Sequence, residues 1–338
     1  MQTQRSIRLP ARLDGSQLPF VAAIAGSLVV AYALVGPQQF SNFLTIGAVY
    51  ALIALGYTMV YGIIELINFA HGDVFMVGSF VALWILSGPL GLHGSIDNPA
   101  LLAVVLVGLF LVTMLILGAL GIFIERFAYR PLRNAPRLAP LITAIGVSFI
   151  LQNIMQAFFG PSPVNSPQIF TLNARFDVAG ASIGYLNVFI VAVAVALMIA
   201  LQLFVGRTRL GRAMRSTAQD REAAELMGVD INLTIAFTFF IGSALAGAAG
   251  IVWVLYFGYA VFNQGFYAGL FAFTAAVLGG IGNTTGAALG GFVIGFLQVA
   301  AAQYGYSRWS EVAIFGVLVL VLVFRPTGLL GQQLGERA

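Results

Sequence analysis

Residues 206–230 read GRTRLGRAMRSTAQDREAAELMGVD, a polar stretch in a chain that is 60% hydrophobic and only 8% charged. The stretch holds five of the 16 basic residues and four of the 12 acidic residues. Placing one arginine at the centre of a bilayer costs about 2.5–3.5 kcal/mol on insertion scales. The five arginines therefore have to lie in water or against another protein, on one defined side of a membrane.

The regions around this stretch are repeated apolar runs, which predict an all-α polytopic membrane protein with about ten transmembrane or partly embedded helices. The predicted segments are 19–36, 42–63, 73–88, 100–124, 138–160, 187–205, 231–257, 266–282, 287–303 and 309–324. A helix of about 16 residues reaches only about 24 Å, less than a hydrocarbon core of about 30 Å. Broken or re-entrant helices are therefore expected in the glycine-interrupted regions 73–88 and 266–303.

Arginine alone sets the orientation, because the chain has no lysine. With the N-terminus inside, 14 of the 16 arginines are cytoplasmic and only Arg175 and Arg308 are outside, as the positive-inside rule requires. The predicted organisation is a cytoplasmic tail at 1–18, one transmembrane domain at 19–331 and a cytoplasmic tail at 332–338. Residues 206–230 form a cytoplasmic loop of that domain. Because the charges lie in loops and follow the side of the membrane, no nucleic-acid partner is expected.

Segment 19–36 has two interpretations. Three arginines precede an apolar core, and Ala31-Tyr32-Ala33 has the A-x-A pattern of a signal-peptide cleavage site. An uncleaved anchor is favoured, because this pattern is common by chance in alanine-rich helices. Segment 42–63 enters from the outer side under either interpretation.

The connection 161–186 is the only long loop expected on the outer face. It is rich in Pro, Asn and Ser and contains Phe170, Phe176 and Asp177. It is either a simple connector or a landing surface for an external partner, and the residues do not separate these alternatives.

Several catalytic classes are excluded or disfavoured. Without lysine the chain has no G-x-x-x-x-G-K-[ST] phosphate loop and cannot hydrolyse ATP by that route. No G-x-S-x-G or H-E-x-x-H motif is present, there is no cysteine, and there are only two histidines. We therefore predict no catalytic residue, no directly bound cofactor and no metal site, and a membrane-embedded enzyme is disfavoured.

A glycine-rich stretch lies between segments 266–282 and 287–303. Both flanks are apolar, which argues against a nucleotide-binding turn. The pattern instead predicts a tight turn followed by a small-residue packing face, although backbone exposure along a solute path stays an alternative. The candidate close-packing residues are Gly279, Gly280, Gly282 and Gly286.

Polar residues also gather between segments 42–63 and 73–88. The candidates are Glu65, Asn68, His71 and Asp73. They are either part of a gate or proton relay, or turn and cap residues at the cytoplasmic interface with Asp73 as the N-cap of the next helix. The inferred topology favours the second interpretation.

The second half of the polar stretch predicts a short helix on the cytoplasmic side. Asp220 and Glu222 lie in its first turn, where acids complement the helix dipole, and Gly228 is a natural stop. Leu226 and Met227 give the helix an apolar tip. Such a helix suits docking into the groove of a partner, although a solvated connector is the alternative. The candidate docking residues are Glu222, Ala223, Ala224, Leu226, Met227 and Gly228.

Glu222-Ala223-Ala224 followed by Gly228 resembles the EAA motif with which ABC importer permeases contact their ATPase subunits. More specifically, the chain resembles the branched-chain amino acid (Liv-type, LivH-like) permease subunits over about residues 41–331. The matching stretches are ALIALGYTMVYGIIELINFAHGDVFMVGS (51–79), IERFAYRPLR (124–133), LITAIGVSFILQN (141–153), GRAMRSTAQDREAAELMGVD (211–230), FTAAVLGGIGNTTGAALGG (273–291) and RPTGLLG (325–331). Segment 19–36 departs from the resemblance and looks like an addition to it.

The resemblance implies an ABC importer permease fold in the bacterial inner membrane, with both termini cytoplasmic. It implies four kinds of partner or ligand: a paralogous second permease or a second copy of this chain, two cytoplasmic ATPase subunits, Mg-ATP on those subunits, and a periplasmic binding protein. Residues 211–230 would contain the coupling helix that the ATPases move. Selectivity would rest mainly with the binding protein.

Three functions follow as alternatives. The first is import of branched-chain or related amino acids, and the second is import of amides, urea or other small organic solutes by the same kind of machine. The third is a self-sufficient secondary carrier or channel that uses Glu65, His71 or Asp73 for proton coupling.

Overall fold

The computed structural model describes residues 18–331, except for residues 67, 93, 134, 137, 171–174 and 179–180. The predicted tails at 1–18 and 332–338 lie outside the described residues, apart from Leu18. The described part is almost entirely helical. The helices are α1 (Leu18–Ile64), α2 (His71–Ser87), α3 (Pro99–Ile124), α4 (Leu138–Phe159), α5 (Tyr185–Arg207), α6 (Arg209–Gln219), α7 (Arg221–Leu226), α8 (Ile231–Phe257), α9 (Gln264–Gly279), α10 (Thr284–Gln303) and α11 (Ser310–Phe324).

The predicted all-α membrane class is confirmed, because every predicted apolar segment coincides with a helix or part of one. Within the described residues, seven helices are long and apolar enough to cross a membrane, and α2 and α9 are shorter apolar helices. Segments 19–36 and 42–63 are the two halves of α1, which bends where Gly36 has a φ of 74° and Pro37 follows it. Proline has no N–H to continue the helix and clashes with the preceding turn, so the two halves run in different directions.

Broken or re-entrant helices were expected at 73–88 and 266–303, and the structure corrects the break expected within 73–88. α2 is one uninterrupted helix of 17 residues, and 266–303 consists of α9 and α10 joined by a turn. The glycines of α2 serve a different purpose, since they allow two backbones to touch. A Cβ atom on Gly78 would lie 2.8 Å from the Cα of Gly247 in α8, and a Cβ on Gly72 would lie 2.7 Å from the Cα of Gly269 in α9.

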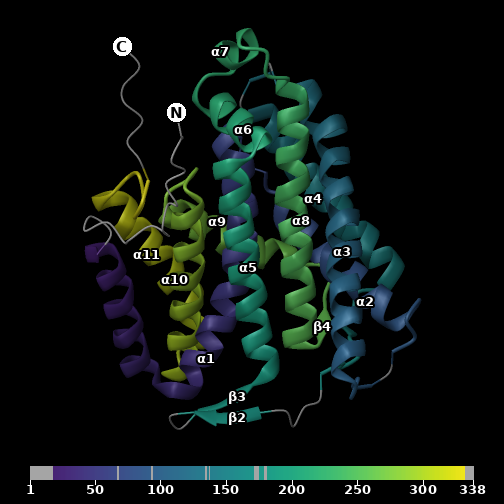
Figure 1. Cartoon of the computed structure of the whole chain (residues 1–338), viewed down its shortest axis with the longest axis vertical. Coiled ribbons are helices and arrows are strands. Elements are labelled where there is room, and N and C mark those ends of the chain that lie inside the picture. Colours follow the sequence, from purple (N-terminus) through teal and green to yellow (C-terminus); the bar gives the residue numbers. More distant parts are fainter. Residues whose placement is uncertain are drawn as a thin grey trace, which may run out of the picture.

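The second half of α1 occupies the centre of the bundle and packs against α8, α9 and α10. The outward faces of α3, α4, α5 and α11 remain apolar and exposed, as expected of helices that meet lipid or another membrane protein. Figure 1 shows α6 and α7 protruding at one end of the bundle and the hairpin of β2 and β3 at the other. The five arginines of 206–230 thus lie at the opposite end from Arg175.

Short antiparallel strands close the end opposite α7. β2 (Arg175–Val178) pairs with β3 (Ala181–Gly184), and β1 (Val164–Asn165) pairs with β4 (Tyr259–Ala260). The connection 161–186 is therefore tied to the end of α8 and to the start of α5.

Candidate functional site

α7 is a short helix that protrudes from the bundle, separated from α6 by Asp220 alone and followed by a turn at residues 227–228 (Figure 1). Asp220 is its N-cap, with the amide of Ala223 donating to Asp220 Oδ1 over 3.0 Å. The helix stops where Gly228 adopts a φ of 84°, a conformation that favours glycine. The predicted helix boundaries agree with this geometry.

The tip of α7 presents apolar side chains to its surroundings. Leu226 is 89% exposed and Met227 is 85% exposed, while Ala224 is buried against the rest of the loop. Glu222 and Ala223 are exposed as well. Isolated apolar side chains with such exposure on a protruding helix fit the anchor positions of a helix that enters a groove.

The four polar candidates between α1 and α2 do not form one cluster. Glu65 is exposed, whereas Asn68, His71 and Asp73 are only 3%, 1% and 1% exposed. The expectation of turn and cap residues therefore fits Asn68, which lies in the connection between α1 and α2, but not His71 and Asp73, which lie buried within α2. They lie inside the bundle because α2 packs along its whole length against α8 and α9.

Asp73 is not the N-cap of its helix, which corrects a second expectation. α2 begins at His71 with Ala70 in the cap position and no side-chain cap. The carboxylate of Asp73 instead accepts hydrogen bonds from Ser148 Oγ over 2.5 Å and from Gln152 Nε2 over 3.1 Å, both on α4. A buried carboxylate needs such donors, and no basic side chain pairs with it among the described residues.

The other two buried candidates have separate partners. Asn68 Oδ1 accepts a hydrogen bond of 2.9 Å from Tyr129 Oη, at the end of α3. The His71 ring lies 4.7 Å from the Tyr57 ring, edge to face. No side-chain hydrogen bond in the described part of the chain joins any two of the four candidates.

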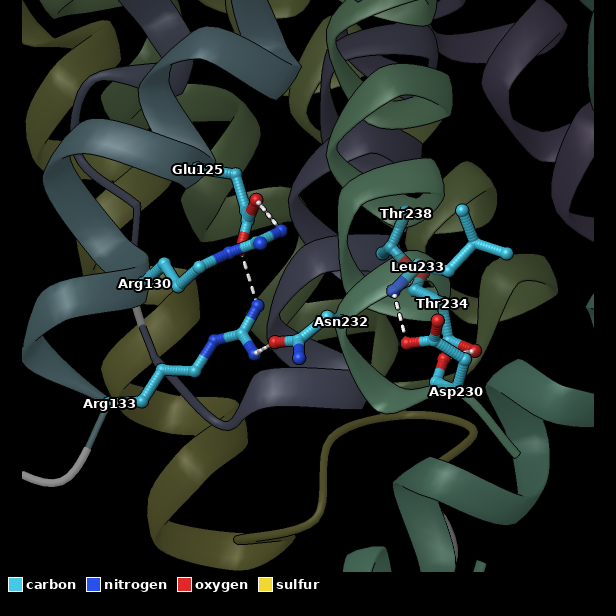
Figure 2. Close-up of polar contacts among 8 residues, drawn as sticks. All are labelled: Glu125, Arg130, Arg133, Asp230, Asn232, Leu233, Thr234 and Thr238. Atoms are coloured by element: carbon cyan, nitrogen blue, oxygen red, sulfur yellow. Dashed lines mark hydrogen bonds and ion pairs between the residues drawn. The ribbon is translucent and has the colours of Figure 1, made fainter. Parts of the chain in front are cut away.

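A charged cluster that the sequence analysis did not single out lies beside α7. Figure 2 shows the carboxylate of Glu125 facing the guanidinium groups of Arg130 and Arg133, directly after α3. Glu125 is fully buried and forms ion pairs with both guanidinium groups, at 2.9 Å for Arg130. Arg133 also donates to Asn232 Oδ1 over 2.7 Å, in the first turn of α8. Burial lowers the pKa of Arg133, and the charge of Glu125 opposes this effect.

This cluster fixes the end of α3 to the start of α8, which directly follows α7. Asp230 caps α8, with the amide of Leu233 donating to Asp230 Oδ1 over 2.9 Å (Figure 2). The signal in the sequence was a single acid in the basic stretch IERFAYRPLR. The sequence shows that its arginines bear on orientation, but no local pattern shows that they pair with this acid.

The four glycines between α9 and α10 have different surroundings. A Cβ on Gly286 would lie 2.2 Å from the carbonyl oxygen of Gly279, and one on Gly280 would lie 2.4 Å from the amide of Gly331. Gly282 has room, with the nearest atom at 3.9 Å, but its φ of 87° favours glycine.

The stretch RPTGLLG closes over this turn. The amides of Leu329 and Leu330 donate to the carbonyls of Leu278 and Gly279 over 2.8 and 3.0 Å. Asn283 Nδ2 donates to the carbonyl of Leu330 over 2.8 Å. The close backbone contacts therefore allow both α10 and the C-terminal stretch to pack against the end of α9.

At the opposite end of the bundle, a cavity of about 380 Å³ lies beside the β2–β3 hairpin. Its lining includes Gln38, Asn42, Arg175, Asn187 and Tyr256. Within the described residues, no group of three or more acidic or histidine side chains lies close enough to hold a metal ion.

Residues 39–323 match the family described as branched-chain amino acid transport system / permease component. The chain belongs to this family. It is 44% identical over 303 residues to the high-affinity branched-chain amino acid transport system permease protein BraD of Pseudomonas aeruginosa, covering 89% of this chain and 97% of the relative. It is 43% identical over 305 residues to the permease protein LivH of the same kind of system in Escherichia coli, with the same coverage of 89% and 97%.

More distant relatives of this permease include the fructose import permease protein FruG of Bifidobacterium longum, 25% identical over 328 residues, covering 92% of this chain and 91% of the relative. No solved structure matches the chain. The comparisons confirm the resemblance noted from the sequence and the expectation of a transport subunit rather than an enzyme. The family match begins after the bend of α1, so the first half of α1 precedes it.

Proposed function

We propose that this permease is the translocation subunit of an ATP-driven importer that carries branched-chain amino acids. The observation that carries the proposal is its identity of 43–44% to two permeases named for high-affinity branched-chain amino acid transport, across 97% of their length. The exposed apolar tip of α7 supports the part of the proposal that concerns ATP, because such a helix can receive force from a groove in a cytoplasmic partner.

The complex we propose contains this chain, a second permease, two cytoplasmic ATPase subunits and a periplasmic binding protein. The second permease is a paralogue or another copy of this chain. Mg-ATP binds to the ATPase subunits, which accords with the absence of lysine and hence of a phosphate loop here. In this arrangement the permease lies in the bacterial inner membrane. Its α7 end and both chain termini face the cytoplasm, and its β2–β3 end faces the binding protein.

The coupling residues of this proposal are those exposed on α7, with Leu226 and Met227 as anchors. Gly228 contributes by ending the helix. Ala224 contributes as the buried residue of α7, on the side away from the exposed anchors. Closure of the ATPase dimer on ATP would displace α7 and switch the bundle between outward-facing and inward-facing states.

Two alternatives differ in what drives transport or what is carried. One relative is named for fructose import, so a solute other than a branched-chain amino acid, such as an amide or urea, is the first alternative. A proton-coupled carrier would require Glu65, His71 or Asp73 to act along a path. The separate partners of His71 and Asp73, and the exposure of Glu65, favour the ATP-driven proposal over such a relay.

Proteoliposomes test the proposal. The chain is reconstituted with its partner permease, ATPase subunits and binding protein, and uptake of labelled leucine is followed. We expect uptake that requires both ATP and the binding protein, and that excess isoleucine or valine suppresses while fructose and urea do not. Leucine uptake by the chain alone under a pH gradient would overturn the proposal. Competition by fructose or urea would overturn the assignment of substrate.

A further inference from the structure

The first residue of α7 reaches across to the end of a distant helix. Arg221 Nη2 donates to the carbonyl oxygen of Ile64 over 2.6 Å and to that of Ile63 over 3.3 Å. Ile63 and Ile64 are the last two residues of α1, more than 150 positions earlier in the chain. A side chain of α7 thus contacts the inner end of the central helix of the bundle.

The end of α1 has an unusual geometry that makes this contact informative. Glu65 has a φ of 59°, the only positive φ at a non-glycine residue in the described part of the chain. Its amide donates to the carbonyl of Tyr61 over 2.8 Å. This hydrogen bond together with the positive φ forms the left-handed helix end at which glycine is the usual residue. The carbonyls that such a stop leaves open are the ones to which Arg221 donates.

A positive charge at this position is favourable for two reasons. The last carbonyls of a helix have no partner within it, and the helix dipole places partial negative charge there. A hydrogen bond from a charged donor is also about twice as strong as one between neutral groups. Arg221 therefore acts as a cap for α1 that is carried by α7.

There is space beside this cap for it to move. A cavity of about 460 Å³ lies between α7 and the end of α1, and its lining includes Glu65, Arg133, Arg221 and Glu222. α7 touches the bundle through few other residues, since Glu222, Ala223, Glu225, Leu226 and Met227 are all exposed.

We propose that Arg221 transmits the movement of α7 to α1 by capping the carbonyls of Ile63 and Ile64. This inference rests on the proposed function and names the contact through which ATP-driven displacement of α7 reaches the core of the permease. Because the second half of α1 packs against α8, α9 and α10, a shift of its end changes the contacts of all three helices. Arg221 is a positioning residue, since it contacts neither solute nor nucleotide in this account.

The test compares Arg221→Gln, Arg221→Lys and Arg212→Gln in the reconstituted complex. Arg212 is the matched control: it lies in the same loop, and its side chain donates within that loop, to the carbonyl of Arg207 over 3.4 Å. We expect Arg221→Gln to assemble and hydrolyse ATP but to move about tenfold less leucine per ATP, the size expected from losing the shorter of its two charge-assisted hydrogen bonds. Arg221→Lys should restore part of the coupling, and Arg212→Gln should match the wild type.

A structural readout separates transmission from simple destabilisation. Amide hydrogen exchange at residues 61–65 is measured in the complex with and without ATP. In the wild type we expect ATP to change this exchange, and in Arg221→Gln we expect the change to be lost while the rest of α1 stays protected. An Arg221→Gln complex with wild-type coupling, or with the ATP-dependent change intact, would overturn the inference. Failure of the wild-type complex to couple ATP to uptake would instead count against the proposed function.

Discussion

Ser148 donates a hydrogen bond of 2.5 Å to the carboxylate of Asp73 and so joins the peripheral helix α4 to the buried helix α2. Gln152, one turn further along α4, donates to the other carboxylate oxygen over 3.1 Å. Two neutral donors, and no basic side chain of the described residues, satisfy a carboxyl group that is 1% exposed.

The first prediction concerns this pair of helices. We expect Asp73→Asn to keep the fold and most transport, because its amide oxygen can accept the hydrogen bond from Gln152 while its NH2 group donates to the hydroxyl oxygen of Ser148. Asp73→Leu should destabilise the protein by about 1–3 kcal/mol, because it removes the acceptor of the buried Ser148 hydroxyl and leaves Gln152 only its 3.3 Å hydrogen bond to Ser148 Oγ. Thermal unfolding of the purified permease, followed by size-exclusion chromatography, measures both. A strongly destabilised Asp73→Asn protein would show that the negative charge itself is required.

The second prediction concerns the charged cluster beside α7. We expect Glu125→Gln to lower stability by roughly 1–3 kcal/mol, since it removes both ion pairs from a fully buried position, while the partly exposed arginines stay partly solvated. Glu311→Gln is the matched control, because Glu311 is exposed at the start of α11 and has no ion pair in the described residues. Equal unfolding temperatures for the two variants would contradict the structural role of Glu125.

The third prediction ranks three glycine substitutions. We expect Gly286→Ala to be the most harmful, because its Cβ would lie 2.2 Å from a backbone oxygen. Gly282→Ala should cost about 1 kcal/mol from its positive φ alone. Gly146→Ala should be neutral or stabilising, since no atom lies within 4 Å of the added carbon. Unfolding temperatures in detergent give the order, and a Gly286→Ala protein as stable as Gly146→Ala would contradict the close contact.

The fourth prediction concerns the tip of α7. We expect Leu226→Ser with Met227→Ser to leave the stability of the isolated permease unchanged, because both side chains are more than four-fifths exposed. Binding of the ATPase subunits should weaken by about 2 kcal/mol or more, the usual loss when central anchors of an interface are removed. Tyr306→Ser, in the exposed turn between α10 and α11, is the control. Co-purification with the ATPase subunits measures the effect, and equal recovery of both variants would remove α7 from the interface.

The membrane helices could be predicted from the sequence because each one is an apolar run of nearly membrane-spanning length, and α7 because Asp220 and Gly228 mark its ends. α6, a polar helix of 11 residues, was not predicted. The positions of the polar residues could not. Ser148 lies 75 residues from Asp73, and no local pattern shows that α4 supplies the donors that allow a carboxylate to be buried. The same holds for Arg221 and Ile64, 157 residues apart.

The glycine pattern predicts that backbones approach closely, but it does not show which residues meet. The sequence predicts a tight turn and close packing in general, and the structure adds the positive φ at Gly282. That Gly286 meets Gly279, while Gly280 meets the stretch ending at Gly331, depends on how the C-terminal residues fold back over α9. The short length of α2 suggested a broken or re-entrant helix; the helix is unbroken, and its glycines contact α8 and α9.

The central claim is that α7 of this permease docks on a cytoplasmic ATPase, and site-directed crosslinking tests it most directly. The chain has no cysteine, so single cysteines can be introduced without removing others. Met227→Cys at the tip of α7 and Asp177→Cys in β2 at the opposite end are each treated with a bifunctional reagent in the assembled complex. We predict that Met227→Cys crosslinks to an ATPase subunit and that Asp177→Cys does not. An ATPase crosslink from Asp177→Cys, or none from Met227→Cys in a complex that transports leucine, would contradict the account.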